Sequence, residues 1–256
     1  MAVRSANALD TLKRFFSPHR ADSRILVTFL ALVAGLLAFG HLASEIAEGD
    51  TFAMDKAIVT GLRTAADPGV PIGPHWLQGW MIDFTALGGA PVLTLITVVV
   101  VGLLASLQKF RMAGFVAVAI AGGALLSVAI KAIFDRARPE IVPHLVEVTS
   151  ASFPSGHAMN SSIVYLTLAV LLARSQESRR VQIYLITVAI ALALLIGCTR
   201  VYLGVHWPTD VLAGWSVGAA FSAACSLVAK RLQREHTIEQ AHETTEDARG
   251  EDTSPL

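Results

Sequence analysis

Residues 112–130 of this chain read MAGFVAVAIAGGALLSVAI and are followed at once by Lys131. These 19 residues include no charged side chain, and no polar face interrupts the apolar positions. A helix needs about 20 apolar residues to cross the roughly 30 Å hydrocarbon core of a bilayer. The small residues at 121–124 favour the close helix packing found in lipid. The stretch therefore predicts a membrane-spanning helix.

Five further stretches of similar length also lack Lys, Arg, Asp and Glu. They cover residues 25–44, 90–108, 156–173, 181–198 and 211–229. The composition agrees, because only 16% of the chain is charged, whereas a soluble domain has about a quarter of its residues charged. We therefore predict an all-α polytopic membrane protein with six transmembrane helices in a bundle.

Two other interpretations of these stretches fit less well. Six buried helices of a soluble protein would need polar partners to cover them, and this chain has few. The charged start also resembles a secretory signal peptide, but its length of 24 residues suits a retained span better. The predicted organisation is a cytoplasmic basic segment at 1–24, a six-helix membrane domain at 25–230 and a cytoplasmic, disordered tail at 231–256.

The charged residues cancel as a sum but are unevenly distributed. There are 20 Lys and Arg against 20 Asp and Glu, so no net field attracts polyanions, which argues against a nucleic-acid partner. Of the 20 positive residues, 14 lie at the two termini and in the second-to-third and fourth-to-fifth connections. The positive-inside rule then predicts cytoplasmic termini in the cell membrane, with the other connections on the outer face.

Two smaller features carry expectations of their own. Cys198 and Cys225 lie in apolar surroundings without a CxxC spacing, which argues against a disulfide framework or a zinc site and predicts two small buried residues. The first outer connection, residues 45–89, is long and acidic. Within it, the segment from Trp76 to Leu87 is either an amphipathic segment at the interface or a solvated loop with tryptophan anchors.

Three segments on the predicted outer side carry ionisable residues beside helix ends, where such residues are costly and are functional candidates. They are 131–139, 153–157 and 199–210. Lys131, Arg138 and Arg200 suit phosphate oxygens, since guanidinium forks bind them bidentately and an ammonium acts as a point charge. Ser155 and Gly156 precede a helix whose first backbone N–H groups add neutral donors. Together these residues predict a phosphate-binding cradle.

Two histidines complete this set of residues. Asp210 follows His206 by four residues, a spacing that lets the carboxylate fix the imidazole tautomer and keep the other nitrogen nucleophilic. His157 has no carboxylate near it in sequence and is free to give and take a proton. Taken singly, Lys131 and Arg138 are also explained as snorkelling interfacial side chains. His206 and Asp210 alone are also explained as a structural pair or as two metal ligands, although a His-x3-Asp without a further His, Cys or Glu cluster makes a thin metal site.

In combination these residues resemble the three-part signature of the type 2 phosphatidic acid phosphatase superfamily. The matching patterns are Lys131-x6-Arg138-Pro139, Pro154-Ser155-Gly156-His157 and Arg200-x5-His206-x3-Asp210. The family includes membrane lipid phosphate phosphatases, and soluble vanadium haloperoxidases share its site. The six-span layout extends the resemblance over most of the chain. One departure is Thr199, where the family usually has Ser before the arginine; the hydroxyl is kept.

The resemblance implies a metal-independent phosphatase that needs no cofactor and works in two steps. His206 is implied as the nucleophile that forms a phosphohistidine, oriented by Asp210, and His157 as the general acid and base. The implied phosphate-binding residues are Lys131, Arg138, Ser155, Gly156 and Arg200. For His144 and Arg136 we expect loop contacts rather than catalysis.

A site beside the headgroup layer implies a lipid substrate whose tail stays in the bilayer. The compact size resembles bacterial members, which makes undecaprenyl diphosphate, cleaved to undecaprenyl phosphate and phosphate, the first expectation. Phosphatidylglycerophosphate, phosphatidic acid, lipid A and transfer of phosphate to another lipid are the alternatives. A transporter or flippase should show internal repeats or broken helices, and the sequence shows no repeat. A catalytically silent lipid-binding member is disfavoured because every catalytic position is occupied.

Overall fold

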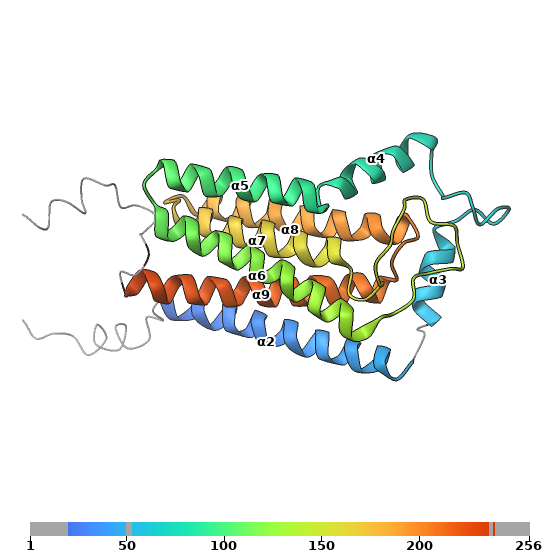
Figure 1. Cartoon of the computed structure of the whole chain (residues 1–256), viewed down its shortest axis with the longest axis horizontal. Coiled ribbons are helices and arrows are strands. Elements are labelled where there is room, and N and C mark those ends of the chain that lie inside the picture. Colours follow the sequence, from blue (N-terminus) through green and yellow to red (C-terminus); the bar gives the residue numbers. More distant parts are fainter. Residues whose placement is uncertain (1–19, 50–52, 236–237, 239–256) are drawn as a thin grey trace, which may run out of the picture.

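The computed structural model describes residues 20–49, 53–235 and 238, and its regular elements in this part of the chain are all helices (Figure 1). They are α2 (Arg20–Ala47), α3 (Ala53–Gly61), α4 (His75–Ala86), α5 (Ala90–Ser106), α6 (Phe110–Phe134), α7 (Gly156–Arg174), α8 (Arg179–Tyr202) and α9 (Pro208–Arg234). The segments predicted at 1–24 and 231–256 lie largely outside the described residues. The predicted all-α fold is confirmed.

Five of these helices, α2, α6, α7, α8 and α9, are long and apolar enough to cross a membrane. α5 has 17 residues and passes the same test only together with α4, from which it is bent by 46°. The described residues therefore contain five candidate spans, or six if the bent pair counts as one. The segment 76–87 is helical in α4, where the exposed rings of Trp76 and Trp80 lie 4.6 Å apart.

α7 is the central helix of the bundle and packs mainly against α8 and α9. Small residues allow this close approach. A Cβ atom at Gly218 of α9 would lie 2.5 Å from Cβ of Ser162 and 2.8 Å from the carbonyl oxygen of Met159, both in α7. Van der Waals contact between small residues is the main attraction available to helices in lipid. The backbones of α7 and α9 therefore pack closely together at Gly218.

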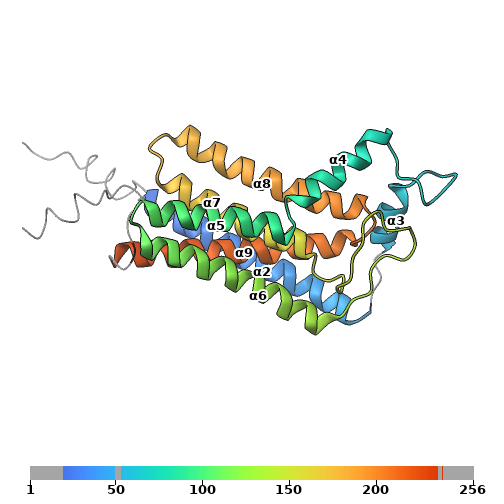
Figure 2. The same cartoon turned by 45° about the horizontal axis from the view of Figure 1, so that its top comes forward.

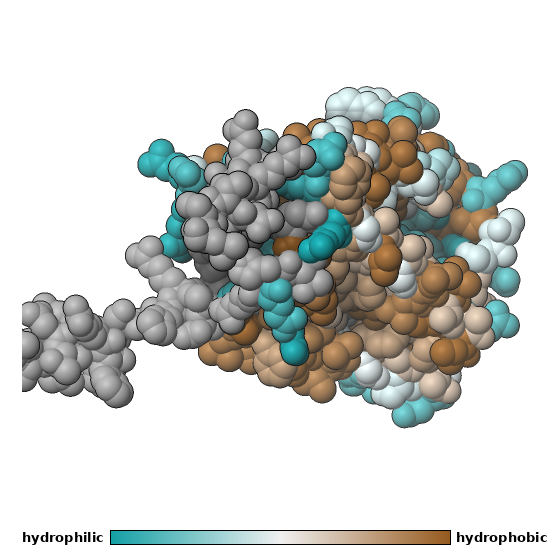
Figure 3. All heavy atoms as spheres, turned by 60° about the vertical axis from the view of Figure 1, so that its left-hand side comes forward, coloured by the Kyte–Doolittle hydropathy of each residue, from teal (hydrophilic) through white to brown (hydrophobic). Residues whose placement is uncertain are grey.

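The outer surface of the bundle is apolar (Figure 3). Large side chains such as Val118, Leu125 and Ile133 are about three-quarters exposed, which a soluble monomer rarely shows over a wide area. Cys198 is exposed and Cys225 is half-buried, so the expectation of two buried cysteines is wrong. On a spanning helix, apolar neighbours in sequence do not distinguish a buried position from one that faces lipid.

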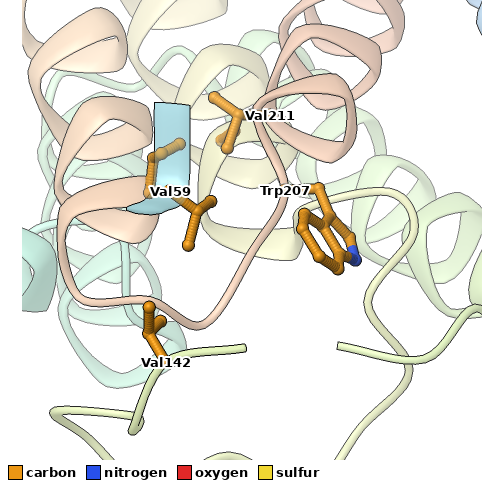
Figure 4. Packing of buried hydrophobic residues seen from close by; sticks show 6 residues of the cluster. Val59, Val142, Trp207 and Val211 are labelled. Carbon is orange, nitrogen blue, oxygen red and sulfur yellow. The ribbon is translucent and has the colours of Figure 1, made fainter. Parts of the chain in front are cut away.

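The N-terminal end of α2 and the C-terminal end of α9 lie at one end of the bundle. At the other end lie α3, α4 and the connections 135–155 and 203–207 (Figures 1 and 2). An apolar cluster ties this second end together (Figure 4). Val59 comes from α3, Val142 from the long connection, and Trp207 and Val211 from the start of α9. The cluster fixes α3 and the long connection to the helix that carries Asp210.

Gly218→Ala should destabilise the bundle because the added methyl meets a Cβ atom and a backbone carbonyl, neither of which can turn away. Overpacking of this kind costs about 1–3 kcal/mol, and each kcal/mol lowers the melting temperature by about 2–4 °C in a chain of this size. Gly102→Ala is the matched control, since a Cβ there has no described neighbour within 4 Å. Equal melting temperatures of the two variants in detergent would contradict the packing described above.

Candidate active site

The first predicted segment begins inside α6 rather than after it. The helix continues to Phe134, which places Lys131 in its last turn. It ends at Asp135, whose φ of 35° lies in the left-handed region, a conformation that Asp adopts more readily than most residues. The Nζ atom of Lys131 donates to the carbonyl oxygen of Ala151 at 2.6 Å. The ammonium group is thus held by a carbonyl oxygen rather than by a carboxylate.

Arg138 lies directly beside His206. Its Nη1 atom donates to the carbonyl oxygen of Val205 and is 3.2 Å from Nε2 of His206, while its Nε donates to the carbonyl oxygen of Ser150 at 2.8 Å. A guanidinium has only donors, so Nε2 must face it with a lone pair. The ring proton of the neutral imidazole then resides on Nδ1.

The environment of His206 keeps the imidazole neutral. The residue is 2% exposed, and burial lowers the pKa of His206 to about 4, although Asp210 acts in the opposite direction. The Nδ1 atom is 3.5 Å from Oδ2 of Asp210 and 3.4 Å from Oγ of Ser152. At neutral pH the ring therefore presents an unprotonated Nε2 toward Arg138.

Asp210 is fully buried and organises the start of α9. The helix begins at Pro208, so Asp210 is its third residue and accepts the backbone N–H of Trp207 through Oδ2 at 2.9 Å, as the acidic member of a capping box does. The Ser152 hydroxyl donates to the same oxygen. One carboxylate thus caps the helix and lies beside the imidazole of His206.

Arg136 does not make the simple loop contacts that we expected. Its Nη1 atom is 2.5 Å from Oδ1 of Asp210, and its Nη2 atom is 3.2 Å from Oδ2 of Asp55 in α3. Asp55 is 1% exposed and also accepts the backbone N–H of Thr209 at 3.0 Å. This ion pair was not expected because Asp55 precedes Arg136 by 81 residues, and no local sequence pattern predicts an ion pair at that separation. From the acidic composition of residues 45–89, Asp55 was expected only to lie in an outer loop.

Arg200 lies in the last turn of α8, not in the connection after it, and is 4% exposed. Its Nη1 atom donates to Oγ1 of Thr85 in α4 at 2.9 Å. Its Nε atom and the Oγ atom of Ser155 are buried without a hydrogen-bond partner in the described part of the chain. Buried polar atoms of this kind are costly to leave unpaired. Arg200 and Ser155 are both residues that the sequence predicts to bind phosphate.

His157 is the second residue of α7 and packs against the turn between α4 and α5. A Cβ atom at Gly88 would lie 3.3 Å from Cδ2 of His157 and 2.4 Å from Cγ2 of Ile196. Only a residue without a side chain lets this turn approach so closely. The turn thereby supports the ring of His157.

A cavity of about 240 Å³ joins these residues. Six of the predicted site residues line it: Lys131, Arg138, Gly156, His157, Arg200 and His206. Thr85 and residues 146–150 complete the wall. Ser155 and Asp210, the other two predicted residues, do not line the cavity. The structure thus brings the three motifs together around one cationic pocket with two imidazoles.

Two other predicted residues make local contacts. The Thr199 hydroxyl donates to the carbonyl oxygen of Ile196 at 2.6 Å, within its own helix. His144 contacts the carbonyl oxygen of Pro139 through Nε2 at 2.7 Å, the kind of loop contact that we expected. Neither side chain lines the cavity. No sequence pattern indicates Ser152 or Thr85 as site residues, since both are ordinary hydroxyl residues outside the motifs.

Comparison with known proteins agrees with this geometry. The PAP2 superfamily model matches residues 113–234. The chain is 34% identical to phosphatidylglycerophosphatase B of Bacillus subtilis over 190 residues, which are 73% of this chain and 88% of that protein. The chain belongs to the PAP2 superfamily.

Within the PAP2 superfamily a solved structure is also similar. It is that of a transmembrane PAP2 type phosphatidylglycerolphosphate phosphatase from Bacillus subtilis, with a TM-score of 0.70 and 29% identity over 79% of this chain and 98% of that one. The undecaprenyl-diphosphatase of Sulfolobus acidocaldarius is 40% identical over 74 residues, 29% of this chain and 32% of that protein. The chain is thus a multi-pass membrane protein of a PAP2 lipid phosphatase family.

Arg136→Gln should destabilise this PAP2 fold strongly, because it leaves the buried carboxylates of Asp55 and Asp210 without their cation. Removing one member of a buried ion pair costs about 3–5 kcal/mol, which chemical unfolding in detergent would measure. Arg231→Gln is the matched control. Arg231 and Glu235 form an exposed pair at 2.9 Å, and such pairs contribute about 0–1 kcal/mol. A similar loss in both variants would show that the Arg136 network does not hold the site together.

The low pKa of His206 predicts a pH dependence of stability. The unfolded chain takes up a proton at this residue below about pH 6.5, whereas the folded chain does so only near pH 4. Stability is therefore complete above the unfolded value and is lost as pH falls between the two. Between about pH 7.5 and 4.5, the melting temperature of the wild type should fall further than that of His206→Asn. The exposed residue His75 provides the control His75→Asn, which should behave as the wild type; a parallel fall in all three proteins would contradict the assignment.

Proposed function

We propose that this chain hydrolyses the phosphomonoester of phosphatidylglycerophosphate through a phosphohistidine on His206, without a metal ion. The observation that carries the proposal is the buried, neutral His206 with Nε2 facing Arg138 at 3.2 Å in a cavity lined by two further cations, Lys131 and Arg200. In such a cavity, the nucleophile and the anion-binding side chains contact the same phosphate group of the substrate.

The choice of substrate rests on the relatives. Phosphatidylglycerophosphatase B of Bacillus subtilis is matched over 88% of its length, whereas the undecaprenyl-diphosphatase is matched over 32% of its own. These matches favour phosphatidylglycerophosphate, an alternative in the sequence analysis, over undecaprenyl diphosphate, the first expectation. Undecaprenyl diphosphate stays the second candidate because the shorter match has the higher identity.

In the first step, Nε2 of His206 attacks phosphorus. The N–P bond forms as the P–O bond to the glycerol breaks, and His157 gives its proton to the leaving oxygen. Lys131, Arg138 and Arg200 stabilise the equatorial oxygens as charge redistributes. Asp210 and Ser152 face the Nδ1–H that becomes more acidic when Nε2 is phosphorylated.

In the second step, His157 accepts a proton from water, whose oxygen attacks phosphorus on the side that the alcohol has left. The N–P bond breaks, inorganic phosphate leaves, and His206 returns to its neutral form with a free lone pair on Nε2. The same cationic side chains act in both steps because the same oxygens carry the charge. Splitting the displacement through a covalent intermediate eases each half of the reaction.

Two further parts of the proposal concern metal ions and orientation. The three cations supply the positive charge that a metal ion supplies in other phosphatases, and no three His, Cys, Asp or Glu side chains of the described residues converge on one point.

The orientation follows from the connections 107–109 and 175–178, which have Lys and Arg residues in or directly beside them. Both connections lie at the bundle end away from the cavity (Figure 1). By the positive-inside rule, the cavity then opens at the outer face.

Phosphate release from a panel of lipids tests this function. The purified full chain in detergent should release phosphate fastest from phosphatidylglycerophosphate, less readily from phosphatidic acid and undecaprenyl diphosphate, and equally well after EDTA treatment. His206→Ala and His157→Ala should each reduce turnover by at least about a thousandfold while their melting profiles show a folded protein.

Each outcome bears on a separate part of the proposal. Release from no lipid, or normal turnover in His206→Ala, would overturn the phosphatase mechanism. Loss of activity in EDTA would overturn metal independence alone. A higher kcat/KM for undecaprenyl diphosphate would overturn only the choice of substrate.

A further inference from the structure

A second cavity lies at the bundle end away from the catalytic cavity. It measures about 540 Å³ and is lined by α2, α7, α8 and α9; we call it the distal groove. Along α7 its lining runs from Arg174 back to Leu166, eight residues or about 12 Å of helix. Val170 and Ile186 make its interior apolar, and Arg179 is exposed at its end. The groove therefore has a basic end and an apolar interior.

Arg174 has only neutral partners. Its Nη2 atom donates to the carbonyl oxygen and the hydroxyl of Ser226 at 2.7 and 2.6 Å, and its Nη1 atom donates to the Gln233 side chain at 3.4 Å. No carboxylate of the described residues lies within 4.0 Å of Arg174 or Arg179. An arginine half-buried at the end of a spanning helix is costly without an anion. Hydrogen bonds hold Arg174 in place, and no carboxylate of the described residues neutralises either charge.

We propose that the distal groove binds an anionic phospholipid, with its phosphate on Arg174 and Arg179 and one acyl chain along the apolar interior. Basic pockets between transmembrane helices bind the headgroups of anionic lipids. A small soluble anion would satisfy the arginines but leave the apolar interior without a partner. A zwitterionic lipid would fill the interior but bring no net negative charge.

This site is separate from the catalytic cavity. His157 and Arg174 are 17 residues apart on α7, which is about 25 Å along the helix. A phosphate on Arg174 is thus beyond the reach of His206, and the bound lipid is not a substrate. Because residues of α2, α7, α8 and α9 line the groove, the lipid stabilises the packing of these four helices. The inference does not depend on the proposed function.

Lipid binding to the purified full chain in an uncharged detergent tests this inference. Phosphatidylserine should remain bound in native mass spectrometry and raise the melting temperature in a concentration-dependent way, whereas phosphatidylcholine and soluble glycerophosphate should not. Arg179→Gln should weaken phosphatidylserine binding by about fivefold, a loss of one favourable charge contact at the membrane surface. The matched control is Arg180→Gln, which removes the neighbouring exposed arginine that does not line the groove.

A second pair of variants tests the apolar interior. Ala223→Leu fills the groove, and Ala191→Leu adds the same bulk at an exposed position of α8 outside it; only the first should reduce the effect of phosphatidylserine. Equal stabilisation by phosphatidylserine and phosphatidylcholine, or equal losses in Arg179→Gln and Arg180→Gln, would overturn the proposal. A shift of the same size with glycerophosphate would show an anion site rather than a lipid site.

Discussion

The catalytic end of the molecule depends on the buried ion pair between Asp210 and Arg136. A carboxylate as deeply buried as Asp210 costs several kcal/mol unless it is paired and hydrogen-bonded. Arg136, the Ser152 hydroxyl and the backbone N–H of Trp207 together meet that requirement. Through Asp55, Arg136 also ties α3 to the start of α9. His206 is positioned because the carboxylate beside it cannot move without breaking all of these contacts.

The partners of each cation separate structural charges from those that can bind an anion. Arg136 faces two carboxylates and is neutralised. Lys131, Arg138 and Arg200 instead donate to carbonyl or hydroxyl oxygens, which fix their geometry and leave their charge. Three cations and one carboxylate, that of Glu147, line the catalytic cavity, which therefore has an excess of positive charge. Arg174 at the other end of the bundle likewise donates only to neutral oxygens, which leave its charge for an anion in the distal groove.

Much of the fold and of the site follows from the sequence because its signals are local. Long apolar runs predict the helices, and three short motifs contain six of the residues that line the catalytic cavity. The helices extend into the charged flanks, so Lys131 and Arg200 lie in last turns rather than in connections. The pairing of Asp55 with Arg136 was not predictable, because it joins residues far apart along the chain. The exposure of Cys198 was missed because lipid accepts the same side chains as the core.

The bend between α4 and α5 follows from the same site. Thr85 at the end of α4 must reach Arg200, and the turn after it must pack on His157. The chain therefore bends by 46° where Gly88 allows backbone contact with Ile196 and the imidazole. The short α5, which makes the number of candidate spans either five or six, thus follows a helix, α4, whose end supplies Thr85 to the wall of the catalytic cavity.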